Sequence, residues 1–224
     1  MRTVCDTQRT REWFEARLGH ITASESAAVL SRYKTKSREN EETAERYGYK
    51  MQLLAERLTG KVTSQFVSIW MKGGSDYEDD ARARFECDQE LLVEQTGFVL
   101  HPKFDFFGAS PDGLLPDNGV LELKVPTPGN HLKYLLGKLD PREEHGAQMV
   151  GEIICCEADY CMFGSYNPDF PPHLKLFTKR YERGDIMQIS AYEEAIVQFN
   201  AEIEEMLEKL SQKPSAAEIA RTAV

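Results

Sequence analysis

The chain has 224 residues, 41% hydrophobic and 29% charged, a composition typical of a folded domain with one sizeable core. No apolar run is long enough for a membrane span, and the first residues lack a signal-peptide core. The net charge of −10 argues against coating of nucleic acid by bulk attraction. Residues 1–38 nevertheless contain eight Arg or Lys against four acids, so charge neither supports nor excludes DNA as a partner.

The predicted elements change from helices to strands near residue 97. Helical patterns in the first part cover residues 8–17, 22–30, 42–59, 64–71 and 75–87, with a basic loop at 32–40. Strands are predicted at 97–101, 106–110, 119–125, 160–166 and 174–181, and helices at 128–138, 142–157 and 189–210. We therefore expect one α/β (α+β) domain over residues 1–211, with helices flanking a mixed central sheet, and a loosely held tail at 212–224.

Five cysteines, an odd number that includes the adjacent Cys155 and Cys156, argue for reduced thiols and a cytoplasmic protein. No C-x-x-C run is present, which argues against an iron–sulfur cluster.

The most informative motif combines Ser110-Pro-Asp-Gly113 with Leu121-Glu-Leu-Lys124. The intervening Asn118-Gly119 is a strong hairpin signal, so the chain is expected to fold Asp112 back toward Glu122. Because side chains alternate along a strand, Glu122 and Lys124 share one face.

Two carboxylates with an ammonium group beside them suit a divalent-metal nuclease. Mg²⁺ accepts a few carboxylate oxygens, keeps several waters and binds substrate phosphate, and a nearby Lys can position water or stabilise negative charge. The alternative is that Glu122 and Lys124 merely occupy a half-exposed strand while Asp112 fills a Pro-Asp-Gly turn.

Three further strings accompany this motif in chain order: Arg17-Leu-Gly-His-Ile-Thr-Ala-Ser24, Tyr77-Glu-Asp-Asp-Ala-Arg82 and Ala147-Gln148. Together the four resemble the bacteriophage lambda exonuclease, or YqaJ-type viral recombinase, family of the PD-(D/E)XK nuclease superfamily. The resemblance extends from about residue 8 to residue 210. It implies a restriction-endonuclease-like core.

The resemblance also implies an activity. Members of this family are Mg²⁺-dependent exonucleases, with Mn²⁺ as a possible substitute, that digest the 5′-phosphorylated strand of duplex DNA to mononucleotides and leave a 3′ single strand. It further implies a toroidal homotrimer and a single-strand annealing protein as partner in phage-type recombination.

Site residues follow from the same resemblance. Asp112, Glu122 and the backbone carbonyl of Leu123 match the family's metal ligands, and Glu78 matches an acidic helix residue near the metal. Lys124 matches the catalytic lysine.

Gln148 matches a glutamine that orients this lysine and the attacking water. The remaining matches are the pocket for the terminal 5′-phosphate, formed by Arg17, Ser24 and Ser110, and the DNA contacts Trp13 and Thr22. A guanidinium fork, hydroxyl groups and a helix N-terminus are all suited to a phosphate.

Structural roles are possible for several of these residues. Glu78 also fits a capping box that begins at Ser75, Gln148 fits a polar helix face, and Arg17 fits a surface ion pair with Glu12 or Glu15.

One position departs from the pattern of related nucleases, because Glu152 stands where a tyrosine often follows the glutamine by four residues. The alternative functions are an endonuclease or junction resolvase of the same fold, and a DNA-binding module without catalysis.

Overall fold

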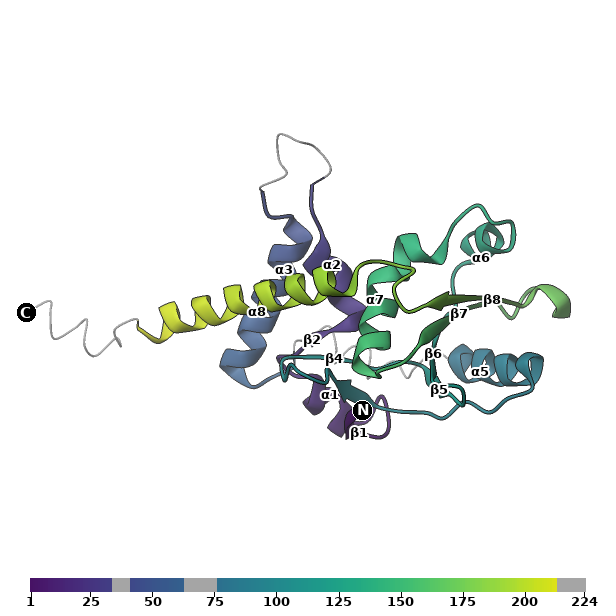
Figure 1. Cartoon of the computed structure of the whole chain (residues 1–224), viewed down its shortest axis with the longest axis horizontal. Coiled ribbons are helices and arrows are strands. Elements are labelled where there is room, and N and C mark those ends of the chain that lie inside the picture. Colours follow the sequence, from purple (N-terminus) through teal and green to yellow (C-terminus); the bar gives the residue numbers. More distant parts are fainter. Residues whose placement is uncertain (34–40, 63–75, 213–224) are drawn as a thin grey trace, which may run out of the picture.

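The computed structural model describes residues 1–33, 41–62 and 76–212 (Figure 1). Its helices are α1 (Arg11–Arg17), α2 (Ser26–Leu30), α3 (Ala44–Thr59), α5 (Asp76–Gln89), α6 (Pro128–Leu135), α7 (Pro141–Cys155) and α8 (Ile189–Ser211). Two 3-10 turns are η1 (Ala23–Glu25) and η3 (Pro172–Leu174). The strands are β1 (Arg2–Cys5), β2 (Ile21–Thr22), β3 (Phe98–Leu100), β4 (Phe107–Ala109), β5 (Gly113–Leu115), β6 (Gly119–Lys124), β7 (Tyr160–Tyr166) and β8 (Leu176–Glu182).

These strands form two mixed sheets in the described part of the chain. The first has the spatial order β1-β3-β4-β2 and the second the order β5-β6-β7-β8. Strands β2 and β4 are parallel, as are β6 and β7, and the other neighbours are antiparallel. The expected mixed sheet is therefore present in two parts, which residues 110–112 connect between β4 and β5.

Helix α7 packs against both sheets, since it contacts β4 of the first and β6 and β7 of the second. Strand β6 has a different neighbour on each face. Val120 belongs to the large core that includes α7, whereas Leu121 and Leu123 pack in a smaller core with Phe85 of α5. Alternation along the strand therefore places Glu122 on the α7 side.

Local sequence explains the two turns that form the site. The hairpin between β5 and β6 has a three-residue loop that ends at Asn118, whose φ of 63° lies in the left-handed region that asparagine tolerates. Gly113 follows Asp112 because a Cβ at this position would lie 1.9 Å from a methyl carbon of Val93. Helix α7 begins at Pro141, with the Asp140 side chain accepting a hydrogen bond from the Arg142 amide.

Most of the predicted elements are confirmed within a few residues, but one expectation is wrong. The segment from Thr22 is not one helix: Ile21–Thr22 pair with β4, and only a 3-10 turn and the five-residue α2 follow. Strand β1 was not predicted. The helix predicted at 64–71, the N-cap at Ser75, and most of the basic loop and tail lie outside the described residues.

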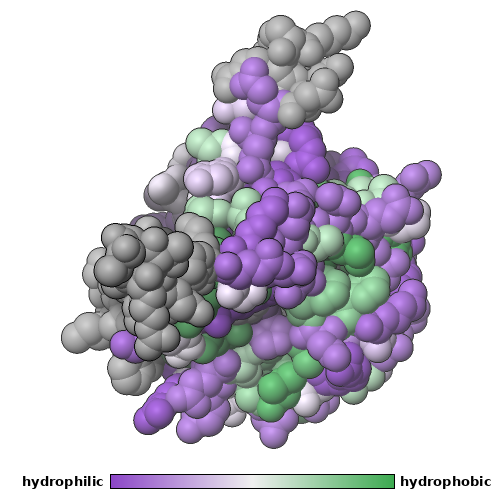
Figure 2. Space-filling view, turned by 90° about the vertical axis from the view of Figure 1, so that its left-hand side faces the viewer, coloured by the Kyte–Doolittle hydropathy of each residue, from purple (hydrophilic) through white to green (hydrophobic). Residues whose placement is uncertain are grey.

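Helix α8 packs against α2 and α3 and extends away from the sheets (Figure 1). The surface seen from its C-terminal side is largely hydrophilic, with apolar areas exposed between the polar side chains (Figure 2). Among the described helices, none has the length and apolar character required to cross a lipid bilayer.

Candidate active site

The β5–β6 hairpin places Asp112 directly across from Glu122. Gly113 pairs with Leu121, and the Asp112 amide donates to the Leu121 carbonyl at 2.9 Å. The Asp112 side chain continues this ladder, because its Oδ2 accepts a 2.6 Å hydrogen bond from the amide of Leu123. The amide and carbonyl of one strand residue point to the same side, so the Leu123 carbonyl also faces Asp112.

Glu122 is only 1% exposed and forms an ion pair with Lys124 on the same face of β6. Its Oε2 atom has no N–H donor among the described residues, and the carboxyl group of Glu152 faces the Glu122 side chain. A buried carboxylate oxygen without a donor is costly unless a cation satisfies it. Asp112, Glu122 and the Leu123 carbonyl therefore provide oxygen ligands suited to a hard divalent ion.

Lys124 is held by α7 as well as by its own strand. Its Nζ atom donates to Oε1 of Gln148 at 3.2 Å. Burial opposes the charge of Lys124, but the carboxylates of Glu122 and Asp112 together raise its pKa above the usual value. In the metal-free site these carboxylates thus favour the charged form of the lysine.

Burial, followed by the Glu122 carboxylate, raises the pKa of Asp112 to about 7, while Lys124, the Leu123 amide and Arg9 oppose the increase. Two carboxyl groups that disfavour each other's charge in this way are a suitable environment for a divalent cation.

Glu152, which the sequence motif did not assign to the site, is fully buried beside it. Its Oε1 accepts a 2.8 Å hydrogen bond from Gln148, one helical turn earlier on α7. Burial and the facing Glu122 carboxylate raise its pKa well above the usual value. Glu152, which stands where related nucleases often have a tyrosine, therefore orients Gln148. Its i, i+4 spacing from Gln148 is the only sequence signal for that role.

A second group of polar side chains surrounds Arg17 at the end of α1. Its guanidinium donates to Ser110 at 3.2 Å and to Ser24 at 3.3 Å, and it stacks over the Trp13 ring at 4.4 Å. The Trp13 indole also donates to Ser110, and Thr22 shares a 3.1 Å hydrogen bond with Ser24. All five residues predicted for the DNA end thus form one network.

Arg17 has the properties of an anion ligand. Of the described residues, none forms an ion pair with it, and Glu15 pairs with Arg11 instead. Burial lowers the pKa of its guanidinium, so an incoming anion would stabilise the charged form. Because α2 has only five residues, the groups suited to bind an anion here are Arg17 and the two serine hydroxyls rather than a helix dipole.

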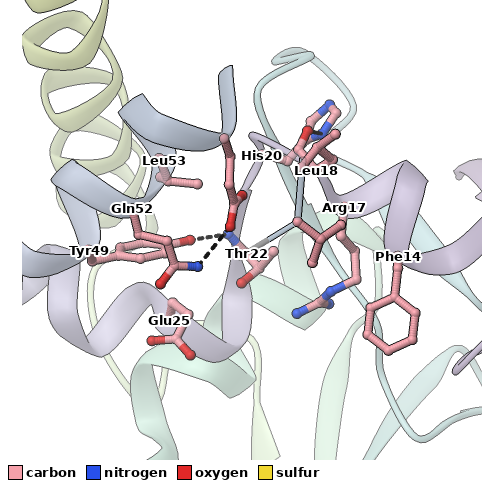
Figure 3. Close-up of a pocket in the computed structure, with 11 residues that line it drawn as sticks. Phe14, Arg17, Leu18, His20, Thr22, Glu25, Tyr49, Gln52 and Leu53 are labelled. Atoms are coloured by element: carbon pink, nitrogen blue, oxygen red, sulfur yellow. Dashed lines mark hydrogen bonds between the residues drawn. The ribbon is translucent and has the colours of Figure 1, made fainter. Parts of the chain in front are cut away.

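Arg17 also lines a pocket between α1 and α3 (Figure 3). Phe14 and Arg17 line one side, and Tyr49, Gln52 and Leu53 line the other. The Tyr49 hydroxyl accepts a 3.0 Å hydrogen bond from the amide of Thr22. This bond fixes the short β2 strand and, with it, the position of Ser24.

Glu78 lies at the border of the site on α5. It lines a pocket with Asp112, and its carboxylate forms an ion pair with Arg9. No three His, Cys, Asp or Glu side chains of the described residues form a ready metal cage. The structure thus brings Asp112, Glu122, Lys124 and Gln148 together, and Glu78 lines the same pocket as Asp112.

The Arg17 network and the carboxylate pair are close in the chain, because Ser110 of the first and Asp112 of the second are separated only by Pro111. A guanidinium with two hydroxyl groups beside a carboxylate–lysine cluster, on sheets flanked by helices, is the arrangement expected of a nuclease.

A sequence model of the YqaJ-like viral recombinase domain matches residues 12–159, and the chain belongs to this family. The structure is similar to the alkaline exonuclease LHK-Exo from Laribacter hongkongensis, with 35% identity, a TM-score of 0.77, and coverage of 94% of this chain and 100% of that one. LHK-Exo in complex with dAMP gives 33% identity and a TM-score of 0.78 over the same shares.

A phage-related exonuclease from Haemophilus somnus 129PT shares the fold, at 12% identity and a TM-score of 0.65, over 85% of this chain and 96% of the other. No curated protein matched.

Proposed function

We propose that this protein is a Mg²⁺-dependent exonuclease that digests duplex DNA from a 5′-phosphorylated end, in the 5′→3′ direction, and releases mononucleotides. The observation that supports this proposal most directly is the two-residue step from Ser110 to Asp112. In an extended chain this step spans at most about 7 Å. A terminal phosphate on Arg17 would therefore leave the next phosphodiester near Asp112, which favours removal of one nucleotide at a time.

Each residue of the site has a role in this reaction. Asp112, Glu122 and the Leu123 carbonyl would hold Mg²⁺, with Glu78 on its outer side, and Mn²⁺ fits the same oxygen donors. When bound, the ion supplies charge stabilisation at the phosphate and lowers the pKa of a coordinated water.

Lys124 provides a fixed positive charge where negative charge develops on the scissile phosphate, and Gln148 holds the Lys124 ammonium in place. Glu152 in turn fixes the amide of Gln148. Arg17, with Ser24 and Ser110, holds the 5′-phosphate, while Trp13 and Thr22 support that pocket.

The known relatives support the substrate class. LHK-Exo has been solved with dAMP, a 5′-phosphorylated mononucleotide of the kind this reaction would release. We extend the proposal to assembly: a toroidal homotrimer would enclose the duplex, and a single-strand annealing protein would receive the 3′ strand.

The test is digestion of a linear duplex that has a 5′-phosphate on one end only, with Mg²⁺ and with EDTA. We expect Mg²⁺-dependent release of mononucleotides from the phosphorylated strand alone. Nicking of closed circular DNA would instead indicate an endonuclease, and binding without cleavage would indicate a non-catalytic module.

A further inference from the structure

The segment between β1 and α1 is attached to the turn that bears Asp112. The side-chain amide of Gln8 donates to the carbonyl of Pro111 at 2.7 Å and to that of Thr96 at 3.0 Å. Arg9 follows with a φ of 63°, in the left-handed region that few non-glycine residues adopt. The hydrogen bonds of Gln8 thus fix the backbone from which Arg9 extends.

Arg9 acts on two of the acidic residues of the site. Its Nη2 atom forms an ion pair with Oε2 of Glu78, and its positive charge opposes the increase in the pKa of Asp112 that burial and Glu122 cause. Both carboxylates and Arg9 line one pocket, together with Asp6, Thr7, Gln8, Asp79, Arg82, Gln95 and Thr96.

The pocket's second arginine has a different partner. Arg82 forms an ion pair with Asp79 on the same helix, and the amide oxygen of Gln95 is placed to accept from its guanidinium. Arg9 is therefore the arginine of this pocket that neutralises a proposed metal ligand. With 41% of its side chain exposed, it is free to change partners.

We propose that Arg9 competes with the divalent ion for Glu78 in the DNA-free protein, and that it exchanges Glu78 for a phosphate of the substrate strand when metal and DNA bind together. This inference rests on the metal site proposed above. The guanidinium of Arg9 pairs with a Glu78 oxygen that a cation beside Asp112 would need as a ligand. Its positive charge would also repel that cation. Once displaced, it lies next to the scissile region, where phosphate oxygens match its planar fork.

The exchange makes metal and DNA binding cooperative. Without DNA, the cost of breaking the Arg9–Glu78 pair reduces metal affinity. With DNA, the new Arg9–phosphate contact offsets that cost, so each ligand strengthens the binding of the other by the same factor. A partly exposed ion pair corresponds to a change of about two- to fivefold in the dissociation constant.

The test is calorimetric titration of the full-length protein with Mn²⁺, comparing R9Q with R11Q. Arg11 is a matched control, since it is two residues away and pairs only with Glu15 on α1 among the described residues. Each protein is titrated without DNA and with a 5′-phosphorylated duplex whose terminal linkages are non-hydrolysable phosphorothioates. We expect R9Q to bind Mn²⁺ about two- to fivefold more tightly without DNA and to lose a similar factor of cooperativity with DNA.

Equal Mn²⁺ affinities of R9Q and R11Q without DNA would overturn the inference. A second variant, R9K, keeps the charge, so its Mn²⁺ affinity without DNA should be close to that of the unsubstituted protein. If R9K instead bound Mn²⁺ as tightly as R9Q does, competition by charge would be refuted. An error in the proposed metal site would be recognised separately. In that case D112N would bind Mn²⁺ with the same affinity as the unsubstituted protein.

Discussion

The hydrogen bond from the amide of Leu123 to Oδ2 of Asp112 connects the turn after Ser110 to the strand that bears Glu122 and Lys124. Its length is 2.6 Å, and it fixes the orientation of the Asp112 carboxylate from the opposite side of the hairpin. The turn and strand halves of the motif therefore move as one unit, which is what a metal site shared between them requires.

Asp112→Asn should abolish metal-dependent cleavage while leaving DNA binding measurable. Asparagine can still accept from Leu123, so the hairpin is retained, but the charge that would hold the cation is lost. We expect the rate of nucleotide release to decrease by at least about a hundredfold. Asp117→Asn, in the exposed loop of the same hairpin, is the control. An unchanged rate in Asp112→Asn would refute the site assignment.

Lys124→Ala should reduce turnover much more than metal affinity. Removing the ammonium deprives the reacting phosphate of a fixed positive charge, whereas it frees Glu122 from its ion pair. The expected loss in kcat is about a hundredfold, measured at saturating Mg²⁺ alongside the Mg²⁺ dependence of the rate. Lys133 is exposed, and its ammonium donates to Asn130 on the same helix, so Lys133→Ala should behave as the unsubstituted protein. A normal kcat in Lys124→Ala would remove Lys124 from the mechanism.

Glu152→Ala should reduce kcat with little change in KM, because Glu152 acts through Gln148 and not on the substrate. Glu152→Gln keeps the volume and an acceptor oxygen, so it should restore most of kcat. If both variants had the same kcat as the unsubstituted protein, Glu152 would have no positioning role.

The catalytic half of the site could be predicted because its signals are local. Asp112, Glu122 and Lys124 lie within one hairpin, where turn residues and strand alternation determine which side chains meet. Glu152 shows the limit of that approach. Its spacing from Gln148 is visible in the sequence, but only the packing of α7 on β6 shows that Glu152 faces Glu122 while Gln148 contacts Lys124.

The contacts that could not be predicted join distant segments. Arg9 lies 69 residues before Glu78, and no periodicity connects the two. Strand β2 has only two residues, too few for a strand pattern, and it is formed by parallel pairing with β4, more than 80 residues later. Local helical signals after Thr22 were overridden by this pairing.

Arg17→Lys should weaken the preference for a phosphorylated 5′ end. Lysine keeps the positive charge but cannot contact Ser110 and Ser24 simultaneously as the guanidinium does. We expect the ratio of the initial rates on 5′-phosphate and 5′-hydroxyl duplexes to fall about tenfold, corresponding to about 1.4 kcal/mol. Arg11→Lys on the same helix is the control. An unchanged ratio would show that Arg17 does not bind the terminal phosphate.

Glu202→Gln should destabilise the protein in a pH-dependent manner. Glu202 of α8 pairs with Arg46 and Lys50 of α3, whose side chains are 7% and 5% exposed. Burial opposes the charge of Glu202, but hydrogen bonds from Arg46 and Lys50 lower its pKa from 4.5 to about 2. We expect a loss of about 1.5–3 kcal/mol in the free energy of unfolding at pH 7.

Because the folded-state pKa of Glu202 is below the unfolded value, its contribution is fully present above pH 4.5 and disappears as the pH falls toward 2. Denaturant unfolding of the two proteins should therefore differ at pH 7 and converge across that interval. Glu204→Gln is the control, since Glu204 is on the same helix but is 59% exposed in its pair with Arg57. A stability difference that stayed constant from pH 7 to pH 2.5 would show that the charge of Glu202 does not stabilise the contact between α3 and α8.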